Sequence, residues 1–148
     1  MPAYDRERYS PAAAVATVSV RDLASGATVD EVSMLLDSGA DISALPKAVV
    51  DALALPVGDR AYEVMAYDNT VRECPNLSAE VVFMRGHFKG RFIVLDQDVG
   101  VLGRNILNHL VVTLDGQFLW FHNAIRRPGD ARRSAYLSAL GSMVILSV

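Results

Sequence analysis

The sequence predicts a mainly β domain with one or two short helices, and three observations support this fold class. Apolar and polar residues alternate with period two over several short runs, most clearly over Thr28–Asp37. Turn signals such as Ser25–Gly26 and Asp115–Gly116 separate the runs. Helical spacing of apolar residues is confined to a segment after Pro46 and a turn or two at Asn105–Leu110.

The first half of the chain predicts a hairpin, a short strand and a helix, in that order. The runs on either side of Ser25–Gly26 form the hairpin, which leads into Asp37. A short strand is expected at Ile42–Leu45. A helix can begin at Pro46, because the N–H that proline lacks has no partner in the first turn of a helix. Pro56 and Gly58 are expected to end that segment.

Three further hairpins are expected after the helix. The hairpin at Tyr62–Cys74 turns at Asp68–Asn69, because Asn tolerates the left-handed backbone region, and Pro75 is expected to break its return strand. The next hairpin turns at Gly86–His87. The last has a two-residue turn at Asp115–Gly116, flanked by apolar runs.

Length and composition exclude several classes of protein. The chain has 148 residues, enough for one full-sized domain rather than two, and its net charge of −3 gives no reason to expect a nucleic-acid ligand. The single cysteine, Cys74, cannot form an intramolecular disulfide or a structural zinc site, and His87, His109 and His122 are too scattered for a metal pair. No run approaches the roughly 18 apolar residues of a membrane helix, and the N-terminus is no secretory signal. We therefore expect a cytoplasmic protein without a metal, a cofactor or a membrane anchor.

The chain divides by composition into three parts. Residues 1–11 form an N-terminal extension, residues 12–125 the folded domain, and residues 126–148 a C-terminal segment. That segment begins with an arginine-rich stretch, for which an exposed linker is a simpler interpretation than a nucleic-acid contact, and continues as the apolar run after Ser134. The apolar run is expected to pack on its own domain or on another chain.

Two short motifs carry the chemistry. The first is Asp37–Ser38–Gly39–Ala40, which directly follows an apolar strand, so that its carboxylate is expected to be at least half buried. The second, Val101–Leu107, reads VLGRNIL, and its Arg104 follows Asp37 by 67 positions (104 − 37). An Asp-Ser-Gly sequence alone is a common turn. The two motifs in this order, with a hairpin between them, resemble the retropepsin-like (retroviral-type) aspartic proteases over about residues 12–121.

This resemblance implies a small closed β-barrel of the acid-protease type, in which the Tyr62–Cys74 hairpin is the flap. It also implies an activity, the hydrolysis of a polypeptide substrate by a water molecule held between two Asp37 carboxyls. Two carboxylates held close together share one proton, so that the pair serves as base and acid at once. The chain contains one Asp-Ser-Gly turn and therefore supplies half of such a site, which predicts a homodimer with one Asp37 from each chain.

The resemblance also assigns supporting residues. Ser38, Gly39 and Ala40 would support the active-site turn, and a buried ion pair between Asp41 and Arg104 would link the two motifs. The residues implied to bind substrate are Asp41, Tyr67, Asp68 and Asn69.

Simpler interpretations remain open for several of these residues. Arg104 fits an ordinary structural salt bridge equally well, and an aromatic residue such as Tyr67 more often packs in a strand than binds substrate. The flap tip carries no glycine, unlike the viral flaps. The alternative function is therefore a catalytically silent module of the same fold, for dimerisation or peptide binding.

Overall fold

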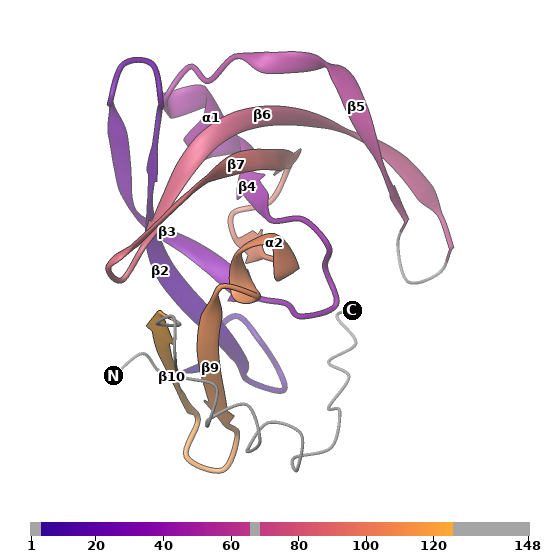
Figure 1. Cartoon of the computed structure of the whole chain (residues 1–148). Coiled ribbons are helices and arrows are strands. Elements are labelled where there is room, and N and C mark those ends of the chain that lie inside the picture. Colours follow the sequence, from indigo (N-terminus) through magenta and orange to yellow (C-terminus); the bar gives the residue numbers. More distant parts are fainter. Residues whose placement is uncertain (1–3, 66–68, 126–148) are drawn as a thin grey trace.

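The computed structural model of this protein describes residues 4–65 and 69–125. These residues form a mainly β structure with two short helices, which confirms the predicted class (Figure 1). In chain order the elements are β1 (Tyr4–Asp5), β2 (Ala13–Arg21), β3 (Thr28–Leu36), β4 (Ala44–Pro46), α1 (Lys47–Ala52), β5 (Val57–Met65), β6 (Val71–Phe83), β7 (Gly86–Leu95), β8 (Gly100–Leu102), α2 (Arg104–Leu107), β9 (Leu110–Asp115) and β10 (Trp120–Ile125).

One large sheet dominates the structure. Its strands follow the order β1-β2-β3-β8-β4-β7-β6-β5, and β9 and β10 pair separately in a two-stranded sheet. Strand β2 also pairs with β6, through Ser19–Arg21 and Glu80–Val82. The second and the second-to-last strands of the large sheet therefore meet, and the sheet curls around the core between them.

The core follows the period-two alternation of the sequence. Alternate residues of β2 and of the second half of β3 are buried, because successive side chains of a strand point to opposite faces, whereas β6 also buries the consecutive residues 76–77 and 79–81. Each fully buried large aliphatic or aromatic side chain stabilises the fold by roughly 1.5–3 kcal/mol relative to an exposed one. The buried side chains of these three strands include Val18, Val20, Val32, Met34, Leu36, Leu77, Val81 and Phe83, and Phe92, Leu102, Ile106 and Phe121 join them from later elements.

Strand β6 is longer than the sequence predicts. It runs through Pro75, where a break was expected, so that prediction is wrong. Pairing with β7 begins only at Asn76, and Pro75 is paired with Ala61 of β5 alone. A proline is tolerated where a strand has a neighbour on one side only, since its missing N–H then breaks no ladder hydrogen bond.

The turn of the last hairpin also differs from the prediction. Asp115 pairs with Trp120, so the turn has four residues, 116–119, rather than the two predicted. The Oδ1 atom of Asp115 accepts hydrogen bonds from the backbone N–H groups of Gln117 (3.1 Å) and Phe118 (3.0 Å). The Asp side chain thus satisfies two backbone donors of a wider turn, an arrangement typical of Asp at turns.

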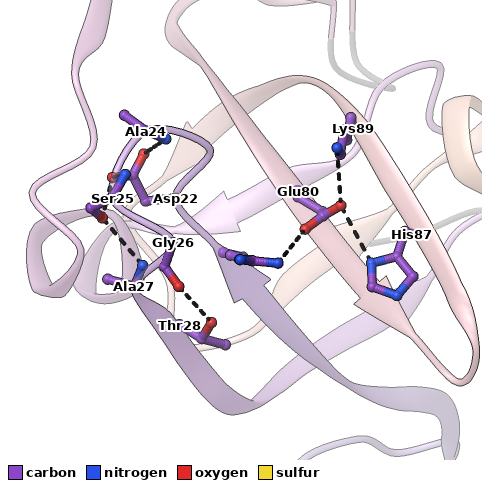
Figure 2. Close-up of polar contacts among 10 residues, drawn as sticks. Asp22, Ala24, Ser25, Gly26, Ala27, Thr28, Glu80, His87 and Lys89 are labelled. Atoms are coloured by element: carbon purple, nitrogen blue, oxygen red, sulfur yellow. Dashed lines mark hydrogen bonds and ion pairs between the residues drawn. The ribbon is translucent and has the colours of Figure 1, made fainter.

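The turn between β2 and β3 forms where Ser25–Gly26 predicts it (Figure 2). The carboxylate of Asp22 accepts hydrogen bonds from the Ser25 hydroxyl and from the backbone N–H groups of Ala24 (3.1 Å) and Ser25 (2.9 Å). These bonds, the Ser25 hydroxyl foremost, hold the pKa of Asp22 below its usual value. Gly26 has a φ of 76°, which glycine adopts without strain.

A buried carboxylate lies where β2, β6 and β7 meet. Glu80 on β6 is only 3% exposed and is paired in register with Arg21 of β2 and Lys89 of β7. Its oxygens lie 3.7 Å from Arg21 Nη1, 3.3 Å from His87 Nδ1 and 3.8 Å from Lys89 Nζ (Figure 2). Three basic groups around one carboxylate offset the free energy that its removal from water costs.

Part of the expected N-terminal extension joins the sheet. Tyr4 and Asp5 pair with Ala14 and Ala13 of β2, and the Tyr4 N–H donates a hydrogen bond to the Leu119 carbonyl (2.8 Å). The expected C-terminal segment, 126–148, lies outside the described residues. Neither helix of the described chain is long and apolar enough to cross a membrane.

Candidate active site

The Asp37 carboxylate lies at the end of β3, in a turn that holds it firmly. Strand β3 pairs in parallel with β8, and this ladder continues one residue further, because the Asp37 N–H donates to the Leu102 carbonyl (3.0 Å). The Gly39 N–H donates to Asp37 Oδ1 (2.8 Å), and the Ala40 N–H donates to the Asp37 carbonyl (3.3 Å). Asp37 is 9% exposed, as its position after an apolar strand predicts.

The two sequence motifs are in direct contact. The Arg104 N–H, at the start of α2, donates to the Ala40 carbonyl (2.8 Å), and the Asn105 N–H donates to the Asp41 carbonyl (3.3 Å). The first N–H groups of a helix have no partner within the helix. Here the loop after Asp37 supplies two of those partners, so the helix and the loop position each other.

A hydrogen-bond cluster centred on the buried Ser43 joins the two motifs, in addition to the ion pair that the resemblance implies. Ser43 is fully buried, and both its hydroxyl (2.7 Å) and its N–H (2.9 Å) donate to Asn105 Oδ1. The same hydroxyl oxygen accepts the Gly103 N–H (2.9 Å). Sequence reasoning missed Ser43 and included Asn105 in the second motif without giving it a role of its own. The available signal was a serine inside the apolar run Ile42–Leu45, because a buried hydroxyl needs partners.

Gly103 allows this close approach. A Cβ atom at this position would lie 2.8 Å from the carbonyl carbon and oxygen of Ile42 and 2.9 Å from the carbonyl oxygen of Ala40. These neighbours are backbone atoms, which cannot move aside as a flexible side chain can. A side chain at position 103 would therefore push α2 away from the loop that carries Asp37.

Arg104 and Asp41 do form an ion pair, between Arg104 Nη2 and Asp41 Oδ1. The expectation that the pair is buried is wrong for the single chain, because the two side chains are 50% and 80% exposed respectively. Neither side chain is enclosed by the contact between loop and helix, whereas Ser43 is fully buried there. The ion pair therefore lies in solvent, where such a pair contributes little to stability.

The other residues that the sequence singled out are only partly described. Ser38 and Gly39 are exposed at the turn, and Ala40 is half-buried. Asn69 is exposed and has a φ of 63°, which confirms the left-handed conformation predicted for it. Tyr67 and Asp68 lie outside the described residues.

The arms of the predicted Tyr62–Cys74 hairpin are paired. Residues Tyr62 to Met65 of β5 oppose Val71 to Cys74 of β6 in regular register. The hairpin extends away from the body of the sheet and curves over the side on which the β3–β4 connection lies (Figure 1). That connection is the loop that carries Asp37.

Two other features do not belong to the site. Among residues 4–65 and 69–125, no three His, Cys, Asp or Glu side chains are grouped as metal ligands would be. A surface depression of about 400 Å³ lies between β5, β6 and β7, and its lining includes Asp59, Asn76 and Arg91. None of its lining residues comes from the two motifs.

Comparisons with known proteins identify solved structures that share this architecture. None of the protein-family models and none of the curated proteins matches the chain. Solved structures do match. A retropepsin-like aspartic protease from Rickettsia conorii is 20% identical and aligns over 82% of this chain and 86% of its own, with a TM-score of 0.55. EIAV protease complexed with the inhibitor HBY-793 is 27% identical over 71% of this chain and 90% of its own, with a TM-score of 0.49.

The match to the Rickettsia protein shows the fold. The chain has the retropepsin-like fold over most of its length, which confirms the resemblance predicted from the two motifs.

Proposed function

We propose that this protein is an aspartic endopeptidase that acts as a homodimer and uses one Asp37 from each protomer. The observation that carries the proposal is the buried Asp37 carboxylate at the end of β3, held in place by the contact between the two motifs. A dyad needs two such groups, and the sequence contains a single Asp-Ser-Gly turn. A two-fold axis beside Asp37 would bring two copies of the turn together.

The chemistry follows from two carboxyl groups that share one proton. The ionised Asp37 takes a proton from a water molecule, whose oxygen attacks the peptide carbonyl carbon, while the protonated Asp37 donates its proton to the carbonyl oxygen. The resulting tetrahedral intermediate collapses: one of its hydroxyl groups returns a proton to the dyad, the C–N bond breaks, and the amine leaves with the proton that the dyad took from water. One water molecule is consumed, and one new carboxyl group and one new amine are released.

Several finer assignments are part of the same proposal. The curled sheet closes as a barrel, and the β5–β6 hairpin acts as a flap that excludes water. Asp41, Tyr67, Asp68 and Asn69 bind substrate, Ser38–Ala40 support the turn, and the protein is cytoplasmic. The φ of Asn69 supports a turn at the end of this hairpin, because Asn adopts the left-handed region more readily than most residues.

The first test is the digestion of a broad peptide library by pure protein at about pH 4–7. We expect cleavage that an aspartic-protease inhibitor suppresses and that Asp37→Asn abolishes without loss of the folded structure. Asp59→Asn on β5 is the matched control and should cleave normally. Full cleavage by Asp37→Asn would refute the mechanism. A folded, dimeric wild-type protein that binds peptides without cutting them would indicate the catalytically silent module instead.

The second test addresses the two-chain site. Wild-type protein is mixed with increasing amounts of Asp37→Asn protein, and the cleavage rate per wild-type chain is measured. If the site needs Asp37 from both chains, the rate falls as mixed dimers form. A rate per wild-type chain that stays constant, although sedimentation shows that mixed dimers have formed, would mean that one carboxylate suffices.

A further inference from the structure

The β5–β6 hairpin has two chemically different faces. Leu77, Ala79 and Val81 of β6 are buried in the core, and successive odd positions of a strand share one face. Val71 and Glu73 continue that face outward, beyond the body of the sheet. The register places Met65 opposite Val71 and Glu63 opposite Glu73. The inner face of the hairpin therefore carries an apolar pair near the tip and an acidic pair next to it.

The opposite face carries the basic residue of the paired arms. Arg72 lies opposite Val64, and both alternate with the inner-face positions. The charges of the paired arms, Tyr62–Met65 and Val71–Cys74, are thus divided, with carboxylates inside and a guanidinium outside. Two glutamates directly opposite each other repel and destabilise a hairpin, so this pair does not stabilise the arms themselves. A cation placed between the two carboxylates would relieve the repulsion.

The inner face is open in the single chain. Met65 is 67% exposed and Val71 54% exposed, and both glutamates are exposed as well. The hairpin curves over the side of the molecule that holds the Asp37 loop (Figure 1). An extended peptide that reaches Asp37 beneath the hairpin would lie against this face.

We propose that the inner face of the hairpin selects peptides in which an apolar residue and a Lys or Arg stand two positions apart. The inference rests on the proposed peptidase function and names its substrate class. The apolar pair Met65–Val71 and the acidic pair Glu63–Glu73 are one strand repeat apart, about 6.6 Å. Side chains at positions i and i+2 of an extended peptide share a face and have the same separation. The apolar side chain contacts Met65 and Val71, and the basic side chain reaches both carboxylates.

The test compares peptides that are identical except at one position. Each has an apolar residue followed two positions later by Lys, Gln or Glu. Binding is measured by fluorescence anisotropy on the Asp37→Asn protein, and cleavage is measured with the wild-type protein. At low salt we expect the Lys peptide to bind about three- to tenfold more tightly than the Gln peptide, and the Glu peptide to bind most weakly. At about 0.5 M salt the Debye length is about 4 Å, and the preference should largely vanish.

Two variants locate the preference. In the Asp37→Asn background, the double variant Glu63→Gln/Glu73→Gln should bind the Lys and Gln peptides equally. It should also melt no lower than its parent, because it removes a repulsion rather than a stabilising contact. Arg72→Gln, on the outer face of the same arms, is the matched control and should retain the preference for Lys.

The outcomes separate this inference from the proposed function. A preference for Lys in binding, combined with no cleavage by the wild-type protein, would retain the inference and refute the peptidase. Cleavage with equal binding of the three peptides would retain the peptidase and overturn the inference. Binding of none of the peptides, or a preference that survives Glu63→Gln/Glu73→Gln, would overturn the inference as well.

Discussion

Replacing Ser43 by alanine should weaken the contact between the two motifs of the candidate active site without changing Asp37 itself. Ser43 is fully buried, and its hydroxyl oxygen both accepts the Gly103 N–H and donates its own proton to Asn105 Oδ1. The substitution removes both hydrogen bonds. It leaves three hydrogen bonds between the loop and α2 in place: the Ser43 N–H to Asn105 Oδ1, and the two backbone bonds that Ala40 and Asp41 accept from Arg104 and Asn105.

The magnitude follows from the hydrogen bonds that are lost. Each contributes about 0.5–1.5 kcal/mol net, and the Gly103 N–H, left buried without a partner, adds a desolvation penalty of roughly 1–3 kcal/mol. Because these terms overlap, we expect the free energy of unfolding to fall by about 2–4 kcal/mol. For a domain of this size that corresponds to a decrease in Tm of roughly 5–15 °C.

The assay is urea unfolding followed by fluorescence, with peptide cleavage measured on the same preparations. Ser78→Ala replaces an exposed serine of β6 and is the matched control, with an expected change within about 0.5 kcal/mol. A double-mutant cycle of Ser43→Ala with Asn105→Ala should show coupling, since the two side chains share a hydrogen bond. A change below about 0.5 kcal/mol in Ser43→Ala, or no coupling to Asn105, would refute the view that this cluster joins the motifs.

Two further substitutions test other parts of the structure. Gly103→Ala places a Cβ atom within 2.9 Å of backbone atoms of Ile42 and Ala40. We therefore expect the free energy of unfolding in urea to fall by roughly 1–3 kcal/mol and the cleavage rate to decrease. Gly116→Ala, where a Cβ would meet nothing within 4 Å, is the control and should change neither quantity. An unchanged Gly103→Ala protein would mean that α2 and the loop are not in tight contact. Asp22→Asn tests the lowered pKa of the Asp22 carboxyl. The charge of Asp22 stabilises the fold at any pH above the pKa that this group has in the unfolded chain. That stabilisation is lost as the pH falls through the lower pKa that the group has in the folded state. The stability difference between wild type and Asp22→Asn should therefore be constant from about pH 7 to 5 and should shrink below the ordinary Asp pKa of 3.8; a difference that grows on acidification would contradict the assigned hydrogen bonds.

Much of the site was accessible from local sequence. The position of Asp37 after an apolar strand predicted its burial, and Asn69 predicted a left-handed residue at the hairpin turn. Both are short-range effects, because alternation fixes which face of a strand a side chain takes and turn residues carry their own backbone preferences. The order of the two motifs also led to the retropepsin-like fold.

Predictions were wrong where an outcome depended on a neighbouring strand or on the geometry of a turn. Pro75 continues β6 because β7 begins to pair only beyond it. The Asp115–Gly116 turn is wider than predicted, and the Asp115 side chain stabilises the wider turn by accepting hydrogen bonds from the backbone N–H groups of Gln117 and Phe118. Neither outcome follows from the strand and turn preferences of the residues alone.

The sequence by itself determined that this is a mainly β chain with a single Asp-Ser-Gly turn, and that the aspartate of this turn directly follows an apolar strand. The tertiary structure decided how the two motifs are joined. The resemblance assigned this link to Asp41 and Arg104, yet their side chains are largely exposed, while the fully buried Ser43 hydroxyl bonds both Gly103 and Asn105. Ser43 and Asn105 are 62 positions apart, and Ser43 is 60 positions from Gly103. Whether groups that distant meet, and whether water is excluded between them, depends on how the whole sheet packs, and burial gives a hydrogen bond between neutral groups more weight than an exposed ion pair.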